Sequence, residues 1–213
     1  MREVCAATGL LGEDIGPVFP EHDFFVDFFT RYYTDVEPQS ALVVEAGGKV
    51  VGYLLGCTDF KRYRRYQMAV LGKAVFFVLK GLYRGSFGPP ARRFFRWLLI
   101  RGWREVPKCP GGGAHFHFNL LRPWRDASTT RRLVDTFLDI LSREHPGIKV
   151  VWGQMETFGA RRSSALFHRL GWQFYDQVPL SKYRYLFGSS PPPHLRKLSS
   201  GEVYLTTIYR TLS

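Results

Sequence analysis

Two histidines separated by a single residue, His115 and His117, are the most reactive pair of side chains in the middle of the chain. The apolar residues Ala114, Phe116 and Phe118 alternate with them, and this period of two predicts a strand with two unlike faces. Side chains two positions apart on a strand point the same way, so both imidazoles lie on one face. Since an imidazole ordinarily titrates near pH ~6.5, either histidine is suited to accept a proton from a substrate ammonium.

The histidine pair has two interpretations. Either it lines the sheet and makes hydrogen bonds within it, or it faces a substrate, with His117, the residue closer to the following loop, as the first candidate base. Glu156, just after a strand predicted over Lys149–Gln154, is a further candidate base, and its plain alternative is a solvated loop acid. No third metal ligand stands near the His-x-His pair and no CxxC occurs, so no metal site is expected.

A basic turn and an amphipathic helix follow the histidine strand. The segment Arg122–Ser128 breaks the alternation, and from Thr129 to Glu144 apolar residues recur at spacings of three and four, which predicts a helix. A helix N-terminus presents free N–H groups and the positive end of the helix dipole, so this turn is a candidate phosphate site. The alternative is a capped, basic helix start, because Ser and Thr are good N-caps and Asp126 suits the dipole.

The remaining elements predict one mixed α/β domain over residues 1–213. A buried helix is expected over Asp23–Tyr33, and Gly47-Gly48 joins two strands into a hairpin. The further expected elements are the end of a helix at Met1–Gly9, strands at Ala41–Glu45 and Val50–Gly56, a short helix at Ala165–Leu170, an exposed loop at Gly188–Pro193, and strands at Trp172–Tyr183 and Val203–Leu212.

A helical insertion is predicted between the hairpin and the histidine strand, over about residues 60–113. It holds two basic-apolar helices, Met68–Tyr83 and Ala91–Arg101, around a Gly/Pro turn. Its apolar faces either cover the sheet or form a dimer contact, or residues 60–104 touch a membrane or lipid surface. Nucleic-acid binding is a third interpretation, but no specific motif supports it.

Composition narrows the class of protein. The formal net charge of +12 over 213 residues favours an anionic partner such as a nucleotide cofactor, a nucleic acid or an acidic membrane surface. Three widely spaced cysteines fit a reducing compartment without a disulfide framework. The first residues lack the apolar core of a signal peptide, and no apolar run reaches the roughly 18 residues of a membrane span. We therefore expect a cytoplasmic protein.

Several of these stretches together resemble the GCN5-related N-acetyltransferase (GNAT) superfamily, and the chain looks like a divergent member from about Leu42 to Leu212. The resemblance rests on four stretches: the hairpin ALVVEAGGKVVGYLLG, the run HFHFNLLRPWRDASTTRRLV, the segment SSALFHRLGWQFYDQV and the closing strand VYLTTIYRTL. The resemblance implies a mixed, largely antiparallel central sheet flanked by helices, interrupted here by the helical insertion.

The resemblance also implies a reaction, in which an amine of unknown identity attacks the thioester of acetyl-CoA directly. In this family the fourth-strand backbone pairs with the pantetheine arm and the following loop binds the pyrophosphate. Carried onto this sequence, the implied cofactor-binding residues are Asn119, Leu120, Leu121, Arg125, Asp126, Ala127, Ser128, Thr129, Thr130, Arg131, Ser164 and Phe167.

The sequence departs from the family pattern at the loop and at the acid. Asp126, Ser128 and Thr130 stand where many members have glycine, which lets the backbone approach a phosphate. Phe167 stands where the family often has a tyrosine as general acid. These departures favour a second hypothesis, a catalytically inactive binding or assembly module of the same fold, associated with a membrane surface through its basic-aromatic insertion.

Overall fold

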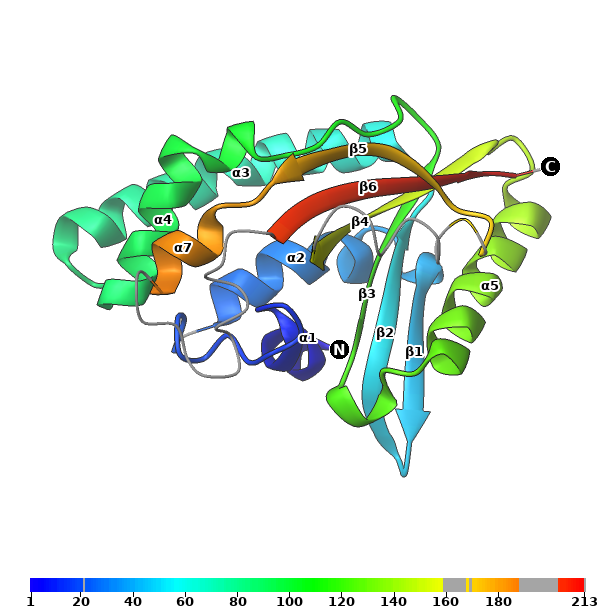
Figure 1. Cartoon of the computed structure of the whole chain (residues 1–213), viewed down its shortest axis with the longest axis horizontal. Helices are drawn as coiled ribbons and strands as arrows, with labels where there is room; N and C mark the ends of the chain where they lie inside the picture. The colour runs from blue at the N-terminus through cyan, green and yellow to red at the C-terminus, as the bar shows by residue number, and fades with distance from the viewer. Residues whose placement is uncertain (21, 159–167, 169, 188–202, 213) are drawn as a thin grey trace. The chain divides into compact units, whose positions relative to one another are not determined.

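The computed structural model describes residues 1–20, 22–158, 168, 170–187 and 203–212 (Figure 1). Its contacts divide the chain into two compact units. The first unit comprises residues 1–70, 111–153 and 211–213, and the second comprises residues 71–110 and 154–210.

The first unit holds the predicted hairpin, the histidine strand and the amphipathic helix. Its elements are α1 (Arg2–Thr8), α2 (Asp23–Asp35), η1 (Pro38–Ser40), β1 (Ala41–Ala46), β2 (Lys49–Cys57), the start of α3 (Phe60–Arg84), β3 (Ala114–Leu120), η3 (Arg122–Trp124), α5 (Ala127–Glu144) and the start of β4 (Val150–Phe158). Strands β1 and β2 turn at Gly47 and Gly48, both at positive φ, as glycine in a tight hairpin allows.

The two faces of β3 pack differently, as the alternation predicts. On one face Phe116 lies against Phe137 of α5, with ring centroids 6.0 Å apart, and Phe137 also fills the space beside Gly56. On the other face His115 lies against Tyr33 of α2. The antiparallel ladder with β2 covers six residues of β3, from His115 to Leu120, whereas the parallel ladder with β4 covers only Ala114 to Phe116.

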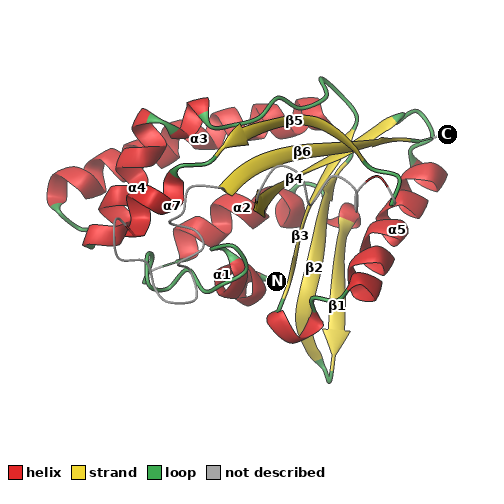
Figure 2. Cartoon of the chain, in the orientation of Figure 1, coloured by secondary structure: helices red, strands yellow, loops and turns green. Residues whose placement is uncertain are grey.

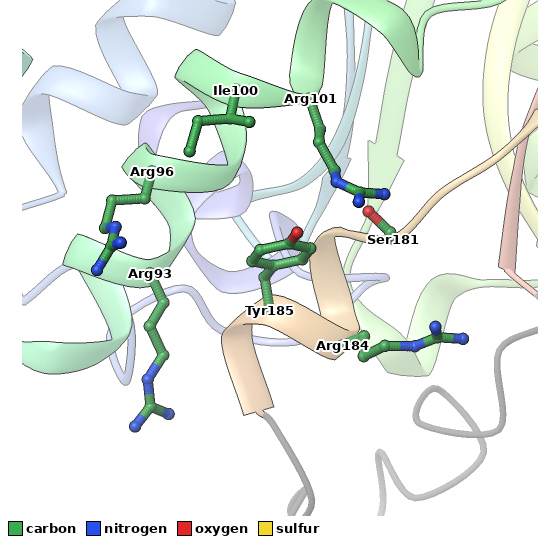
Figure 3. A pocket seen from close by; sticks show the side chains of 7 residues that line it. All are labelled: Arg93, Arg96, Ile100, Arg101, Ser181, Arg184 and Tyr185. Carbon is green, nitrogen blue, oxygen red and sulfur yellow. The ribbon is translucent and has the colours of Figure 1, made fainter.

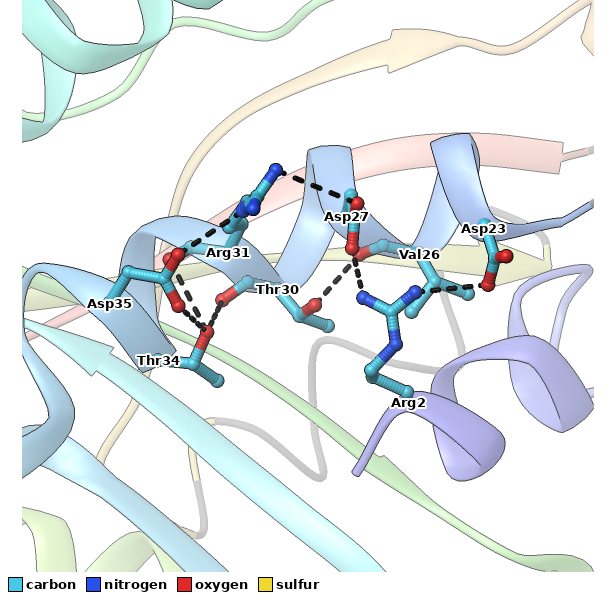
Figure 4. A network of polar contacts seen from close by, with 8 residues as sticks. All are labelled: Arg2, Asp23, Val26, Asp27, Thr30, Arg31, Thr34 and Asp35. Atoms are coloured by element: carbon cyan, nitrogen blue, oxygen red, sulfur yellow. Dashed lines mark hydrogen bonds and ion pairs between the residues drawn. The ribbon is translucent and has the colours of Figure 1, made fainter.

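Helices α1 and α2 are joined by a surface network of ion pairs (Figure 4). The guanidinium of Arg2 lies 3.0 Å from Asp23 and also pairs with Asp27, and Arg31 pairs with Asp35 at 3.1 Å. These side chains are largely exposed, so each pair contributes little to stability, about 0–1 kcal/mol.

The second unit holds the remainder of α3, α4 (Pro89–Ile100), η2 (Gly102–Arg104), the rest of β4, β5 (Gln173–Pro179), α7 (Lys182–Phe187) and most of β6 (Val203–Thr211). Strands β5 and β6 pair antiparallel. Along hydrogen-bonded neighbours the strand order is β1-β2-β3-β4-β6-β5, and helices flank the strands (Figure 2). The predicted fold class, a mixed and mostly antiparallel sheet with helices, is confirmed.

Two predicted elements have different bounds from those expected. The strand expected to run from Trp172 to Tyr183 ends at Pro179, and Lys182–Phe187 is a helix because Tyr183 and Leu186, three residues apart, are both buried. Helix α3 begins at Phe60 rather than Met68, since the carboxylate of Asp59 accepts from the N–H of Arg62 and caps the first turn. The loop expected at Gly188–Pro193 and most of the helix expected at Ala165–Leu170 lie outside the described residues.

In the part of the chain that the structure describes, no helix combines the length and the hydropathy that crossing a membrane requires.

Candidate functional site

His115 sits inside a box of aromatic rings in the first unit. Its ring stacks on Trp152 at 4.8 Å and meets Tyr63 edge-on at 4.5 Å, and its Nε2 lies 3.0 Å from the hydroxyl of Tyr33. With 5% of the residue exposed, burial lowers its pKa to about 3, so the imidazole is neutral near pH 7. This geometry fits the interpretation in which His115 lines the sheet.

Two polar atoms inside the box have no hydrogen-bond partner among the described residues. They are Nδ1 of His115 and Nε1 of Trp152, on two rings that stack against each other. A buried polar atom left without a partner costs about 1–3 kcal/mol, so the box has unused capacity for a polar atom of a ligand.

His117 occupies a more open position on the same face. It is half-buried, and its Nε2 lies 3.4 Å from the hydroxyl of Tyr53 and 3.4 Å from Nδ2 of Asn119. Asn119 also donates to the Tyr53 hydroxyl at 2.8 Å, so the three side chains form one cluster. Desolvation lowers the pKa of His117 to about 4, which leaves the imidazole neutral near pH 7.

Both lowered histidine pKa values make the fold sensitive to acid. The ordinary histidine pKa is about 6.5, so below it the unfolded chain binds protons that folded His115 and His117 do not. The stabilisation is therefore complete above pH ~6.5 and is lost as the pH falls through the folded values of about 3 and about 4.

Glu156 is placed differently from its prediction. Strand β4 continues to Phe158, so Glu156 is a strand residue and not a loop acid. It belongs to the second unit, where it pairs with Nζ of Lys182 and accepts a hydrogen bond from the hydroxyl of Tyr183. Each carboxylate oxygen thus has a partner inside the unit.

A carboxylate of the chain itself, that of Asp126, caps the N-terminus of α5. The carboxylate of Asp126 accepts from the N–H of Thr129 at 2.8 Å and from its hydroxyl at 2.6 Å, which makes Asp126 the N-cap. The Thr129 hydroxyl, followed by backbone N–H groups, holds the pKa of Asp126 below its ordinary value. The capped-start interpretation is therefore realised in the geometry, and a phosphate at this position meets a carboxylate already in place.

The side chain of Arg125 donates hydrogen bonds to backbone carbonyls near the same turn. Its Nε donates to the carbonyl of Leu120 at 2.8 Å, and its guanidinium also donates to the carbonyl of Gly12, which lies at φ +86°. The arginine therefore ties the end of β3 to the loop after α1. In the structure these donors contact backbone carbonyls, and the cofactor contact that the resemblance implies for Arg125 stays a prediction.

The other predicted cofactor-binding residues follow one another along the end of β3, the turn and the first turn of α5. The N–H of Leu121 donates to the carbonyl of Val51 at 2.9 Å, and Arg131 pairs with Asp135 at 3.3 Å. Ala127 and Ser128 are exposed, and Thr130 is half-buried with its N–H donating to the carbonyl of Asp126. Ser164 and Phe167 lie outside the described residues.

Sequence reasoning missed the aromatic partners of the histidines, Tyr33, Tyr53 and Trp152. The only local signal was the period of two in β2, which puts Tyr53 on one face of that strand. Its place beside His117 depends on the register of β2 with β3, in which Tyr53 pairs with Asn119. Tyr33 comes from a helix 82 residues away from His115 in the sequence.

Comparison with known proteins gives matches in structure alone. No protein-family model matches the sequence. No curated protein matches it either. Among solved structures, the crystal structure of SsHAT matches with a TM-score of 0.53 and 21% identity, covering 99% of this chain and 91% of that one.

Two further similar structures have TM-scores below 0.5. Chaetomium thermophilum Naa20 in complex with a bisubstrate analogue gives 0.45 at 16% identity, over 88% of this chain and 73% of that chain. Drosophila melanogaster polyamine N-acetyltransferase gives 0.44 at 14% identity, over 84% and 78%. The resemblance inferred from the sequence is confirmed at the level of architecture: this chain has the GNAT fold, in a divergent form.

Proposed function

We propose that this protein is an N-acetyltransferase that transfers an acetyl group from acetyl-CoA to a primary amine. The observation that carries the proposal is the cluster of His117, Tyr53 and Asn119 on β3 and β2. It holds a neutral imidazole beside the stretch of β3, from His117 to Leu120, that lies beyond the ladder with β4. The GNAT fold supports the same class of reaction.

The proposed reaction needs only a proton acceptor and good positioning from this chain. The amine nitrogen attacks the thioester carbonyl, the C–N bond forms, the C–S bond breaks, and the sulfur leaves as a thiolate, which becomes the thiol when it takes the amine's proton back from His117. His117 takes up the proton that the amine loses, while Tyr53 and Asn119 fix the orientation of its ring. A folded pKa of about 4 makes His117 a weak base, but one that is unprotonated over the whole neutral range.

Asp126 sets the affinity for the acyl donor in this proposal. The turn at 125–131 holds a carboxylate where a pyrophosphate would take its hydrogen bonds from the helix N-terminus, so the site fits the donor only if Asp126 moves or shares its donors. We therefore expect acetyl-CoA to bind more weakly than at a glycine-rich turn.

The test is a mass-spectrometric assay of amine acetylation, over a panel of amines, with isothermal titration calorimetry of acetyl-CoA binding. We expect His117→Gln to lower kcat by about 100-fold or more, as for the loss of a general base, without abolishing acetyl-CoA binding. The matched control is His145→Gln at the C-terminal end of α5, which should retain the wild-type rate. Equal rates for His117→Gln and the control would remove His117 as the base.

The N-cap carboxylate favours a second candidate function, a non-catalytic binding or assembly module of the same fold. The two are separated by acetyl-CoA titration of the wild type and of Asp126→Asn, which keeps an N-cap but removes the charge. Absence of binding by both proteins at millimolar acetyl-CoA would support the module and contradict the enzyme.

A further inference from the structure

The second unit contains a hollow lined by arginines between α4 and α7. Its volume is about 650 Å³. Figure 3 shows the side chains of both helices around it, with the ring of Tyr185 at its centre. Four of the lining residues are Arg93, Arg96, Arg101 and Arg184, and the others are Ile100, Ser181 and Tyr185.

None of these arginines is neutralised by a carboxylate within the described ranges. Arg93 donates to the carbonyl of Leu186 at 3.5 Å, and Arg101 lies 5.8 Å from the centre of the Tyr185 ring. The nearby acid, Glu105, is occupied by Ser181, whose N–H donates to it at 2.6 Å, and by Nε1 of Trp97 at 3.1 Å. Guanidinium groups bind phosphate oxygens in a bidentate manner, so the hollow has the chemistry of a phosphate receptor.

The exposed face of α4 combines the same arginines with aliphatic side chains. Arg92, Arg93, Arg96, Leu99 and Ile100 recur at spacings of three and four and are all exposed, whereas Ala91, Phe95 and Trp97 are buried. Ile100 is 59% exposed and belongs both to this face and to the hollow. A helix face with basic and aliphatic side chains is suited to the boundary between lipid headgroups and acyl chains.

The whole helical hairpin, defined here as residues 71–106, shows the same combination of basic and exposed apolar side chains. Ten of the seventeen exposed large hydrophobic side chains described in the chain fall in this stretch, including Phe76, Tyr83 and Trp103. The same stretch has eight lysines and arginines and a single acid, Glu105. Apolar groups in such number beside uncompensated positive charge are complementary to an anionic membrane surface, and less so to a neutral or cationic partner.

We propose that the hairpin 71–106 docks on an anionic membrane surface and that the arginine hollow between α4 and α7 receives the phosphate of a phospholipid headgroup. The arginines supply attraction to the headgroup layer, and the exposed side chains of α3 and α4 enter the boundary with the acyl chains. This inference is independent of the acetyltransferase proposal, because neither acetyl-CoA nor the histidines take part.

The test is co-sedimentation of the full-length protein with phosphatidylcholine vesicles that contain or lack phosphatidylserine. We expect binding to the anionic vesicles only, weakening as salt screens the charges. Reversing charge in the hollow, Arg96→Glu with Arg184→Glu, should lower the partition coefficient by more than about 25-fold, since each basic residue at such a surface contributes about fivefold. The matched control, Arg132→Glu with Arg143→Glu on the exposed face of α5, changes the net charge equally.

A second pair of variants tests the apolar part. Phe76→Ser with Ile100→Ser should weaken binding to anionic vesicles even at high salt, with unchanged thermal unfolding because both side chains are exposed. Three results would overturn the proposal. These are an equal loss in the hollow and control variants, binding of glycerol phosphate in solution without vesicle binding, and a dimer in solution that Phe76→Ser with Ile100→Ser dissociates.

Discussion

Arginines gather at two places in this protein, and their surroundings differ. At the N-terminal end of α5, Arg125 donates to two backbone carbonyls, Arg131 pairs with Asp135, and the carboxylate of Asp126 fills the helix N-terminus. At the hollow between α4 and α7, four arginines are among the lining residues, and no described carboxylate pairs with them. The sequence drew attention to the first place, and the structure draws it to the second.

A cluster of arginines is therefore not by itself evidence of free hydrogen-bond donors for an anion. A guanidinium engaged by backbone carbonyls or by a carboxylate has its donors in use, and an anion must displace those partners before it binds. A guanidinium with free donors needs no such exchange.

Removing an engaged arginine should cost stability, and removing a free one should not. We expect Arg125→Ala to lower the free energy of unfolding by about 1.5 kcal/mol, because the Leu120 and Gly12 carbonyls each lose a charged donor. Arg184→Ala in the hollow should leave it unchanged or raise it slightly, since like charges repel. Urea unfolding at neutral pH measures both. Equal losses would show that the two groups of arginines do not differ in engagement.

The carboxylate of Asp126 at the α5 N-terminus should raise the stability of the fold and lower its affinity for an anion. We expect Asp126→Ala to lower the free energy of unfolding through loss of the N-cap, whereas Asp126→Asn should keep most of that stability. Both variants should bind acetyl-CoA about fivefold more tightly, because a charge close to the pyrophosphate is removed. Calorimetry beside urea unfolding separates the effects, and unchanged affinity in both variants would place the donor elsewhere.

The stability of the fold at acid pH should depend on the same carboxylate, that of Asp126. Because the folded pKa of Asp126 lies below its ordinary value, the stabilisation it provides is present above that ordinary value and is lost as the pH falls through the folded pKa. Over the acid range the wild type should therefore lose more stability than Asp126→Asn. Arginines stay charged throughout, so an Arg184→Ala variant should follow the wild-type curve. Parallel curves for wild type and Asp126→Asn would contradict the assigned cap.

The smallest effect is expected at the exposed pair of Arg131 and Asp135. The two side chains lie one helical turn apart at 3.3 Å and both are more than half exposed. We expect Arg131→Ala to change the free energy of unfolding by no more than about 0.5 kcal/mol, and less in high salt. A larger loss would mean that Arg131 is engaged as firmly as Arg125.

Much of the fold was predictable because its signals are local. The period of two over Ala114–Asn119, the glycine pair at 47–48 and the spacing of three and four in α5 are each read within a few residues, and all three elements formed as predicted. The helix at Lys182–Phe187 was not, since its six residues lie next to a strand of similar composition and only the burial of Tyr183 and Leu186 distinguishes them.

The sequence by itself determined that His115 and His117 share a face and that a helix starts beside Asp126. It also determined that positive and apolar side chains are interspersed through residues 71–106. Tertiary structure decided the rest. It enclosed His115 in aromatic rings, left His117 half-buried beside Tyr53, and closed the α5 N-terminus with Asp126. It also brought Arg184 to the arginines of α4. The physical reason is that periodicity fixes a side chain's direction, whereas its pKa and partners depend on what distant segments place beside it.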